Sequence, residues 1–157
     1  MLRVTGVWTI LAATEYNRVH GVVDQSGPVH YIFQRAKVMA APNNREYILD
    51  YVGALLFTYQ GATNLETLPD AREKMSLKTR GILDKPMAPM LVIGGVLDTQ
   101  VPIADSDLIL HSGQTPQEAW INPQGGHMGR GSKWSDARIF KTITVPWILR
   151  MLDVKAQ

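Results

Sequence analysis

The sequence predicts an α/β fold, a parallel sheet with flanking helices. Three short apolar runs, at about residues 18–24, 89–95 and 117–122, have the length and composition of buried parallel strands. Segments of helical length separate these runs. Helices between successive strands are the connections that a parallel sheet requires, so the order of the segments favours the α/β class over an all-helical or all-β fold.

The first segment, residues 6–16, is predicted to be a helix. It is almost uniformly apolar, which indicates burial on several sides. The strand that follows is expected to end at Asp24, and a turn, Asp24-Gln25-Ser26-Gly27-Pro28, leaves it.

Residues 35–85 show no strand pattern. Asn43 or Asn44 can begin a helix whose apolar stripe ends at Gly61, and a second helix is expected from Pro69 to Lys78. A helical insertion between two strands of a parallel sheet is typical of a cap that shapes a substrate pocket.

Residues 86–157 return to the strand–helix pattern. Asp105 or Ser106 can cap the helix between the second and third strands, so Asp105 and Asp107 are expected to be capping and surface charges. The last helix is expected to begin at Trp134-Ser135-Asp136, and Pro146 should kink or split it.

Asp98 and His127 are the candidate catalytic residues. Asp98 follows the second strand and His127 follows the third, and the carboxyl ends of parallel strands share one edge of the sheet. A histidine that acts as a general base needs a carboxylate to fix its tautomer and to stabilise the imidazolium. The alternative is that Asp98 only begins a turn and that His127 lies in an ordinary glycine-rich loop.

Three phrases of the sequence resemble α/β-hydrolases, and most closely the fungal hydrolases that process polyketides. They are Gly21-Val22-Val23-Asp24-Gln25-Ser26-Gly27-Pro28-Val29-His30, Gly94-Gly95-Val96-Leu97-Asp98, and the stretch from Glu118 to Arg130 with Gly125-Gly126-His127-Met128-Gly129. The resemblance implies the C-terminal portion of an α/β-hydrolase fold. It divides the chain into core (1–34), helical cap (35–85), and core carrying the acid and histidine (86–157).

The nucleophile that such a hydrolase needs is missing from the sequence. In such hydrolases the catalytic residues occur along the chain in the order serine, acid, histidine, and the serine lies on a Gly-x-Ser-x-Gly turn. These 157 residues contain no such motif. The family comparison places the turn near Arg3-Val4-Thr5-Gly6, with Arg3 or Val4 at the serine position. We expect either that the sequence begins after the turn or that the chain is a degenerate homologue.

Four residues are expected to contribute to substrate binding on the same edge of the sheet: Gln25, Ser26, His30 and Met128. Ser26 could also be a substitute nucleophile. Its surroundings argue against this, because they lack the first glycine of the turn and Pro28 does not suit a helix that starts directly after the serine.

Composition excludes several classes of function. The net charge is +2 with scattered Lys and Arg, so no nucleic-acid partner is expected, and the absence of cysteine excludes disulfides and thiolate ligands. The sequence has no apolar run long enough for a membrane span and no signal peptide, so a cytoplasmic protein is expected. No metal or cofactor is expected. The expected partner is a small-molecule substrate, and a homo-oligomer is possible.

Two functions follow as hypotheses. The first is a serine-type hydrolase that cleaves an ester or carbon–carbon bond in a polyketide-derived or similar small molecule, in secondary metabolism such as pigment biosynthesis. It would use a catalytic triad completed by the missing serine. The second is a non-catalytic α/β-hydrolase-like module that binds a small molecule or a partner.

Overall fold

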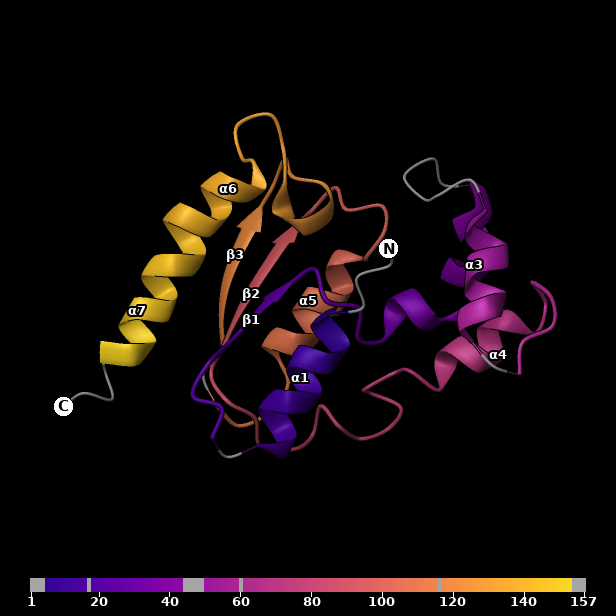
Figure 1. Cartoon of the computed structure of the whole chain (residues 1–157), viewed down its shortest axis with the longest axis horizontal. Coiled ribbons are helices and arrows are strands. Elements are labelled where there is room, and N and C mark those ends of the chain that lie inside the picture. The colour runs from indigo at the N-terminus through magenta and orange to yellow at the C-terminus, as the bar shows by residue number, and fades with distance from the viewer. Residues whose placement is uncertain (1–4, 17, 44–49, 60, 116, 154–157) are drawn as a thin grey trace.

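A computed structural model shows a three-stranded, fully parallel sheet with the strand order β1-β2-β3 (Figure 1). The strands are β1 (Val22–Gln25), β2 (Met90–Gly95) and β3 (Gln117–Asn122). The predicted α/β class is therefore confirmed; β1 begins later than expected and includes Asp24. The structure describes residues 5–16, 18–43, 50–59, 61–115 and 117–153.

Helices cover both faces of the sheet (Figure 1). Helices α1 (Thr5–Glu15) and α5 (Ile103–Leu110) lie on one face, and α6 (Asp136–Ile139) and α7 (Val145–Asp153) lie on the other. This layering buries the central strand completely, since all six residues of β2 are buried.

The side chains of β2 alternate between the two layers. Met90 and Val92 pack into the cluster that contains α1 and α5, whereas Leu91 and Ile93 pack against Ile139 and Trp147 of the other layer. Alternation with a period of two is the geometry of a strand, and here both faces are apolar because both are covered. The sheet is thus the fixed platform from which the turns at its carboxyl edge project.

Helix α1 is buried on one side only. Val7, Ile10 and Ala13 are buried against the sheet, but Trp8 is 64% exposed. The expectation of burial on several sides is wrong for Trp8, because uniform apolarity cannot tell which side of a helix a neighbour covers.

The region from residue 35 to residue 85 contains helices and, among its described residues, no strand. Helices α2 (Arg35–Ala40), α3 (Tyr51–Thr58) and α4 (Leu68–Glu73) lie beside the sheet layers (Figure 1) and share a separate apolar cluster. A short 3₁₀ segment at Ala41–Asn43 follows α2 directly. The predicted start of α3 at Asn43 or Asn44 reaches into residues 44–49, which lie outside the described residues.

The last helix is continuous through a π-helical turn. Ser135 caps α6 through its Oγ, which accepts from the Arg138 amide at 3.3 Å. The π-helical turn, Phe140–Thr144, then joins α6 to α7, and Pro146 follows as the second residue of α7. The expected break at Pro146 thus takes the form of a local change in winding, a recognised cause of helix distortion.

Among the described residues β1 pairs with β2 alone, so its second edge meets no strand. No helix in the described part of the chain is long and apolar enough to cross a bilayer.

Candidate functional site

The turn after β2 holds Asp98 in a fixed orientation. Its Oδ1 accepts two backbone hydrogen bonds, from the amides of Gln100 and Val101, both at 2.8 Å. The side chain is only 2% exposed. The carboxylate therefore has one oxygen committed to its own turn and the other available to a neighbour.

That neighbour is His127, which begins a short 3₁₀ segment, His127–Gly129, after β3. The Nδ1 of His127 lies 3.0 Å from Asp98 Oδ2, and the imidazole is 23% exposed. The two residues are 29 positions apart in the sequence, yet the parallel sheet brings them together at one edge. The imidazole is thus held on one side by a buried acid and open on the other.

Backbone hydrogen bonds join the two turns. The amide of Val96 donates to the Asn122 carbonyl at 3.1 Å, and the amide of Leu97 donates to the Gly125 carbonyl at 2.9 Å. The side-chain amide of Asn122 donates to the Gly129 carbonyl at 2.8 Å. The contact between acid and histidine is therefore supported by main-chain bonds between the two turns and by a side-chain bond within the turn that carries the histidine.

The ionisation of Asp98 suits this contact. Burial acts to raise the pKa of Asp98, but the hydrogen bond from His127 and those from the Val101 and Gln100 amides outweigh it, and the pKa lies below its ordinary value. An ionised carboxylate accepts a hydrogen bond from Nδ1–H, which leaves Nε2 of the neutral ring unprotonated and able to accept a proton.

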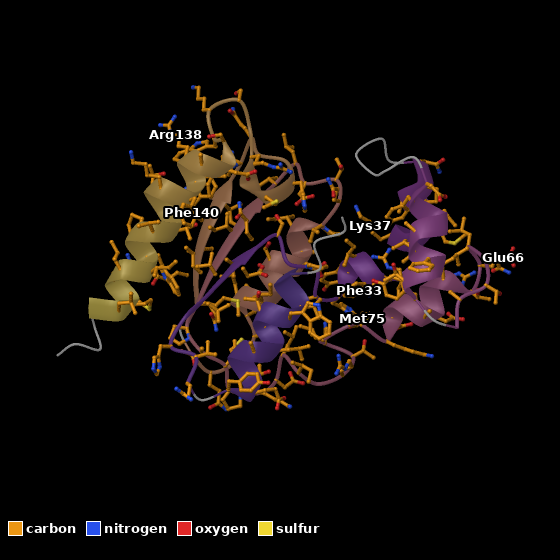
Figure 2. All side chains as sticks on the ribbon, in the orientation of Figure 1. Phe33, Lys37, Glu66, Met75, Arg138 and Phe140 are labelled. Atoms are coloured by element: carbon orange, nitrogen blue, oxygen red, sulfur yellow. The ribbon has the colours of Figure 1, made fainter. Side chains whose placement is uncertain are left out.

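His127 opens onto a pocket of about 280 Å³ at the carboxyl edge of the sheet. One part of its wall comes from the end of β1 and from the turn after β3 that carries His127 and Met128, called the histidine turn below. The rest comes from Gly6 and Thr9 of α1 and from Phe140 and Thr144 of the π-helical turn. Among the described residues that line the pocket, none is a lysine or an arginine. Figure 2 labels the exposed Phe140 on the helix beside the strands.

Three of the four predicted substrate-binding residues line this pocket: Gln25, Ser26 and Met128. They also bond to one another: the Gln25 side-chain amide donates to the Met128 carbonyl at 2.9 Å, and the Met128 amide donates to Ser26 Oγ at 3.0 Å.

The fourth predicted residue, His30, is not among the lining residues. Its Nδ1 lies 2.8 Å from Ser76 Oγ and its Nε2 lies 3.0 Å from the side-chain amide nitrogen of Gln34. The structure therefore places His30 with Ser76 of the helical region and with Gln34, and not with His127.

Asp24 is a pocket residue to which the sequence assigned no role. It is 1% exposed, its Oδ2 accepts from the Gly27 amide at 3.0 Å, and its Oδ1 has no hydrogen-bond partner in the described part of the chain. Burial, opposed by the Gly27 bond and reinforced by the charge of Asp105, raises the pKa of Asp24 to about 6. An acid that directly follows two valines inside a strand is the signal that could have identified it.

Asp105 corrects an expectation. Instead of capping its own helix at the surface, it is fully buried inside α5. Its carboxylate accepts from the amides of His30 at 2.9 Å, Tyr31 at 2.6 Å and Ile32 at 3.2 Å, the start of the 3₁₀ helix Tyr31–Phe33. Asp107 is exposed, as expected for a surface charge.

No group of three or more metal-binding side chains occurs among the described residues. Arg3 and Val4, the predicted serine positions, lie outside these residues, whereas Gly6 lies at the pocket.

Neither protein-family models nor curated protein sequences match this chain. Solved structures do. A protein named AbyA5 superposes with a TM-score of 0.70 at 20% identity, and the match covers 94% of this chain and 40% of AbyA5.

Two further structures are similar. The 2,6-dihydroxy-pseudo-oxynicotine hydrolase has a TM-score of 0.59 at 14% identity, covering 79% of this chain and 32% of the hydrolase. Acetyl xylan esterase 1 from Thermoanaerobacterium sp. JW/SL YS485 has a TM-score of 0.60 at 18% identity, covering 93% of this chain and 42% of the esterase. The chain thus spans about two fifths or less of these proteins. Likenesses of this kind show the fold alone: the parallel sheet and its flanking helices are arranged as in a portion of an α/β-hydrolase fold.

Proposed function

We propose that this chain carries the acid–base half of a serine-type α/β-hydrolase. The observation that carries the proposal is the contact of 3.0 Å between Asp98 Oδ2 and His127 Nδ1, at the wall of a pocket on the carboxyl edge of a parallel sheet. Ligands of open α/β sheets bind at this edge.

The proposed chemistry is acyl transfer by general base catalysis. His127 takes the proton of a serine hydroxyl through Nε2 as the oxygen attacks the substrate carbonyl, and Asp98 stabilises the resulting imidazolium. The imidazolium then returns the proton to the leaving oxygen or carbon. Water completes the cycle by the same route. The serine of this proposal stands on a Gly-x-Ser-x-Gly turn, which these 157 residues do not contain.

The proposed substrate is a polyketide-derived or similar small molecule with an ester or a carbon–carbon bond next to a carbonyl. Three observations support this class. The sequence phrases resemble polyketide-processing hydrolases, two of the similar structures are by name a hydrolase and an esterase, and the described residues that line the pocket include no lysine or arginine to attract a strongly anionic ligand.

The helical region is part of the same proposal, as a cap over the site. Its support is the bond from Lys37 Nζ on α2 to the Thr99 carbonyl at 2.9 Å, beside Asp98. Figure 2 labels Lys37 on the side of the helical region that faces the sheet layers.

A non-catalytic binding module is the second candidate. The lack of a Gly-x-Ser-x-Gly motif favours it, because a pocket without a nucleophile binds ligands but forms no acyl-enzyme.

The DNA upstream of the codon for Met1 distinguishes the two candidates. An in-frame Gly-x-Ser-x-Gly within a few codons upstream of Met1 favours the enzyme, whereas a promoter directly upstream favours the module. The protein expressed from the whole reading frame should then hydrolyse aryl esters or β-diketones and react with a fluorophosphonate probe. Unchanged turnover in its His127→Ala variant would reject the hydrolase.

A further inference from the structure

The turn at the end of β1 grips the residue that follows the histidine. Gln25 Nε2 donates to the Met128 carbonyl at 2.9 Å, and Ser26 Oγ accepts from the Met128 amide at 3.0 Å. Two neighbouring side chains thus hold both polar groups of a single residue that is more than 100 positions away. We infer that Gln25 and Ser26 are positioning residues that set the orientation of His127 by clamping the main chain of Met128.

Backbone strain shows that the clamp holds a conformation that the chain would otherwise leave. Ser26 has φ of 51° and Met128 has φ of 64°, and they are the two described non-glycine residues with positive φ. Residues other than glycine, asparagine and aspartate seldom adopt the left-handed region, and they persist there only where the surroundings enforce it. Here the two strained residues are the two joined by the bond from the Met128 amide to Ser26 Oγ.

The clamp is anchored to the sheet. The Ser26 amide donates to the Ile93 carbonyl of β2 at 2.8 Å, and the buried carboxylate of Asp24 accepts from the Gly27 amide at 3.0 Å. These bonds fix the turn on both sides of Gln25 and Ser26. The histidine turn is therefore held against a rigid support, which is what a preorganised site requires.

The clamp complements the bond from Asp98. Asp98 holds the His127 ring from the side of β2, through Nδ1, and the clamp holds the adjacent backbone from the side of β1. If Met128 relaxed to negative φ, the peptide that carries His127 would rotate and the ring would leave Asp98. This role for Gln25 and Ser26 rests on the proposed function of His127 as a base, and it differs from the direct substrate contact expected from the sequence.

The experiment uses the 157-residue chain and NMR spectroscopy, so it needs no turnover. Ser26→Ala deletes the acceptor of the Met128 amide, and Gln25→Met deletes the donor with little change in size. Ser26→Gly deletes the acceptor and also relieves the strain at that position. Exchange of the Met128 amide should become about tenfold faster in both Ser26 variants, as expected for the loss of one hydrogen bond.

The decisive readout is the His127 tautomer, measured from the ¹⁵N shifts of the ring. The neutral ring should carry its proton on Nδ1 in the wild type and should become a mixture of tautomers in all three variants. The pKa of Asp98 should rise in the same variants, because the hydrogen bond from His127 contributes to its low value. Ser26→Asn, which retains an acceptor on a residue that tolerates positive φ, should restore the wild-type tautomer.

Ser132→Ala and Gln114→Ala are the matched controls, since both residues are exposed and lie outside the clamp. An unchanged tautomer in folded Ser26→Ala and Gln25→Met overturns the inference. If Ser26→Ala does not fold, Gln25→Met decides, because it removes one bond from a half-buried position. The proposed function fails separately: His127→Ala would then leave turnover of the whole reading frame intact, whatever the tautomer does.

Discussion

Gly95 and Gly126 are in backbone contact: a methyl group on Gly95 would lie 2.2 Å from the Gly126 carbonyl oxygen and 2.3 Å from that of Gly125. Both obstacles are main-chain atoms, so no side-chain rotation could relieve the clash. The end of β2 can therefore approach the histidine turn only without a side chain at residue 95. We predict that Gly95→Ala separates Asp98 from His127 and destabilises the chain by about 1–3 kcal/mol, as overpacking does.

Urea unfolding and the His127 tautomer measure the two effects of Gly95→Ala. Gly131→Ala is the control, because its methyl group would meet its nearest neighbour, the Gln124 carbonyl oxygen, at an ordinary 3.4 Å. Equal stability and an unchanged tautomer in Gly95→Ala would contradict the role of this contact.

Asp98→Asn should reverse the tautomer of His127. The side-chain oxygen of the asparagine would stay with the Gln100 and Val101 amides, and its NH₂ group would face Nδ1. The ring proton would then move to Nε2, which could no longer act as a base. In the protein expressed from the whole reading frame, kcat should fall about ten-thousand-fold with the fold preserved. A loss below tenfold would show that Asp98 does not orient the base.

The meeting of Asp98 with His127 follows from the sequence because parallel strands bring their carboxyl ends to a common edge. The strand positions needed only short apolar runs, and the acid and the histidine each follow such a run. The 3.0 Å contact is the geometric result of that pattern.

Asp105 and His30 show where sequence reasoning stops. Asp105 looks like a cap of its own helix, but its partners are amides more than 70 positions away. His30 comes soon after the turn that contains Ser26, so the sequence predicts the same pocket for both residues. In the structure a 3₁₀ helix begins directly after His30, and the imidazole contacts Ser76 instead. Contacts of this kind depend on how loops pack, for which local periodicity carries no information.

Asp105→Ala should be strongly destabilising. It would leave three backbone amides at the start of the 3₁₀ helix without their acceptor, in a buried position. We expect a loss of about 3 kcal/mol in the free energy of unfolding, measured by urea denaturation. Asp107→Ala, on an exposed position of the same helix, should stay within about 0.5 kcal/mol of the wild type. Similar losses in both variants would argue against the buried cap.

Stability should fall as the pH rises from about 4 to about 6. The pKa of Asp24 is raised from 3.8 to about 6, so its contribution is fully present below pH 3.8 and is lost as the folded carboxyl ionises. The rise of the pKa of Asp24 from 3.8 to about 6 corresponds to about 3 kcal/mol of stability. Asp105, whose pKa is also raised by burial, acts in the same direction, whereas Asp98, whose pKa is lowered, contributes stability that is lost at acid pH.

Asp24→Asn isolates this effect. Between pH 4.5 and pH 7.5 the wild type should lose about 2 kcal/mol more stability than Asp24→Asn, measured from urea midpoints at each pH. Asp107→Asn removes an exposed carboxylate and should keep the wild-type pH dependence. Parallel pH profiles for the wild type and Asp24→Asn would show that Asp24 does not titrate in this range.

The 157-residue chain should associate with itself in solution. The described part of the sheet leaves one edge of β1 without a strand partner, and Trp8, Leu149 and Leu152 are large apolar side chains that are at least half exposed. An open strand edge and apolar surface both favour association.

Light scattering after gel filtration should show a mass that rises with concentration. The double variant Leu149→Lys, Leu152→Lys should lower this mass, because it places two charges on the exposed apolar surface of α7. The lysine pair should also leave the His127 tautomer unchanged, since neither residue lines the pocket. A monomer that unfolds cooperatively at every concentration would contradict the prediction. It would mean that the edge of β1 and the exposed apolar side chains remain in contact with solvent without causing association.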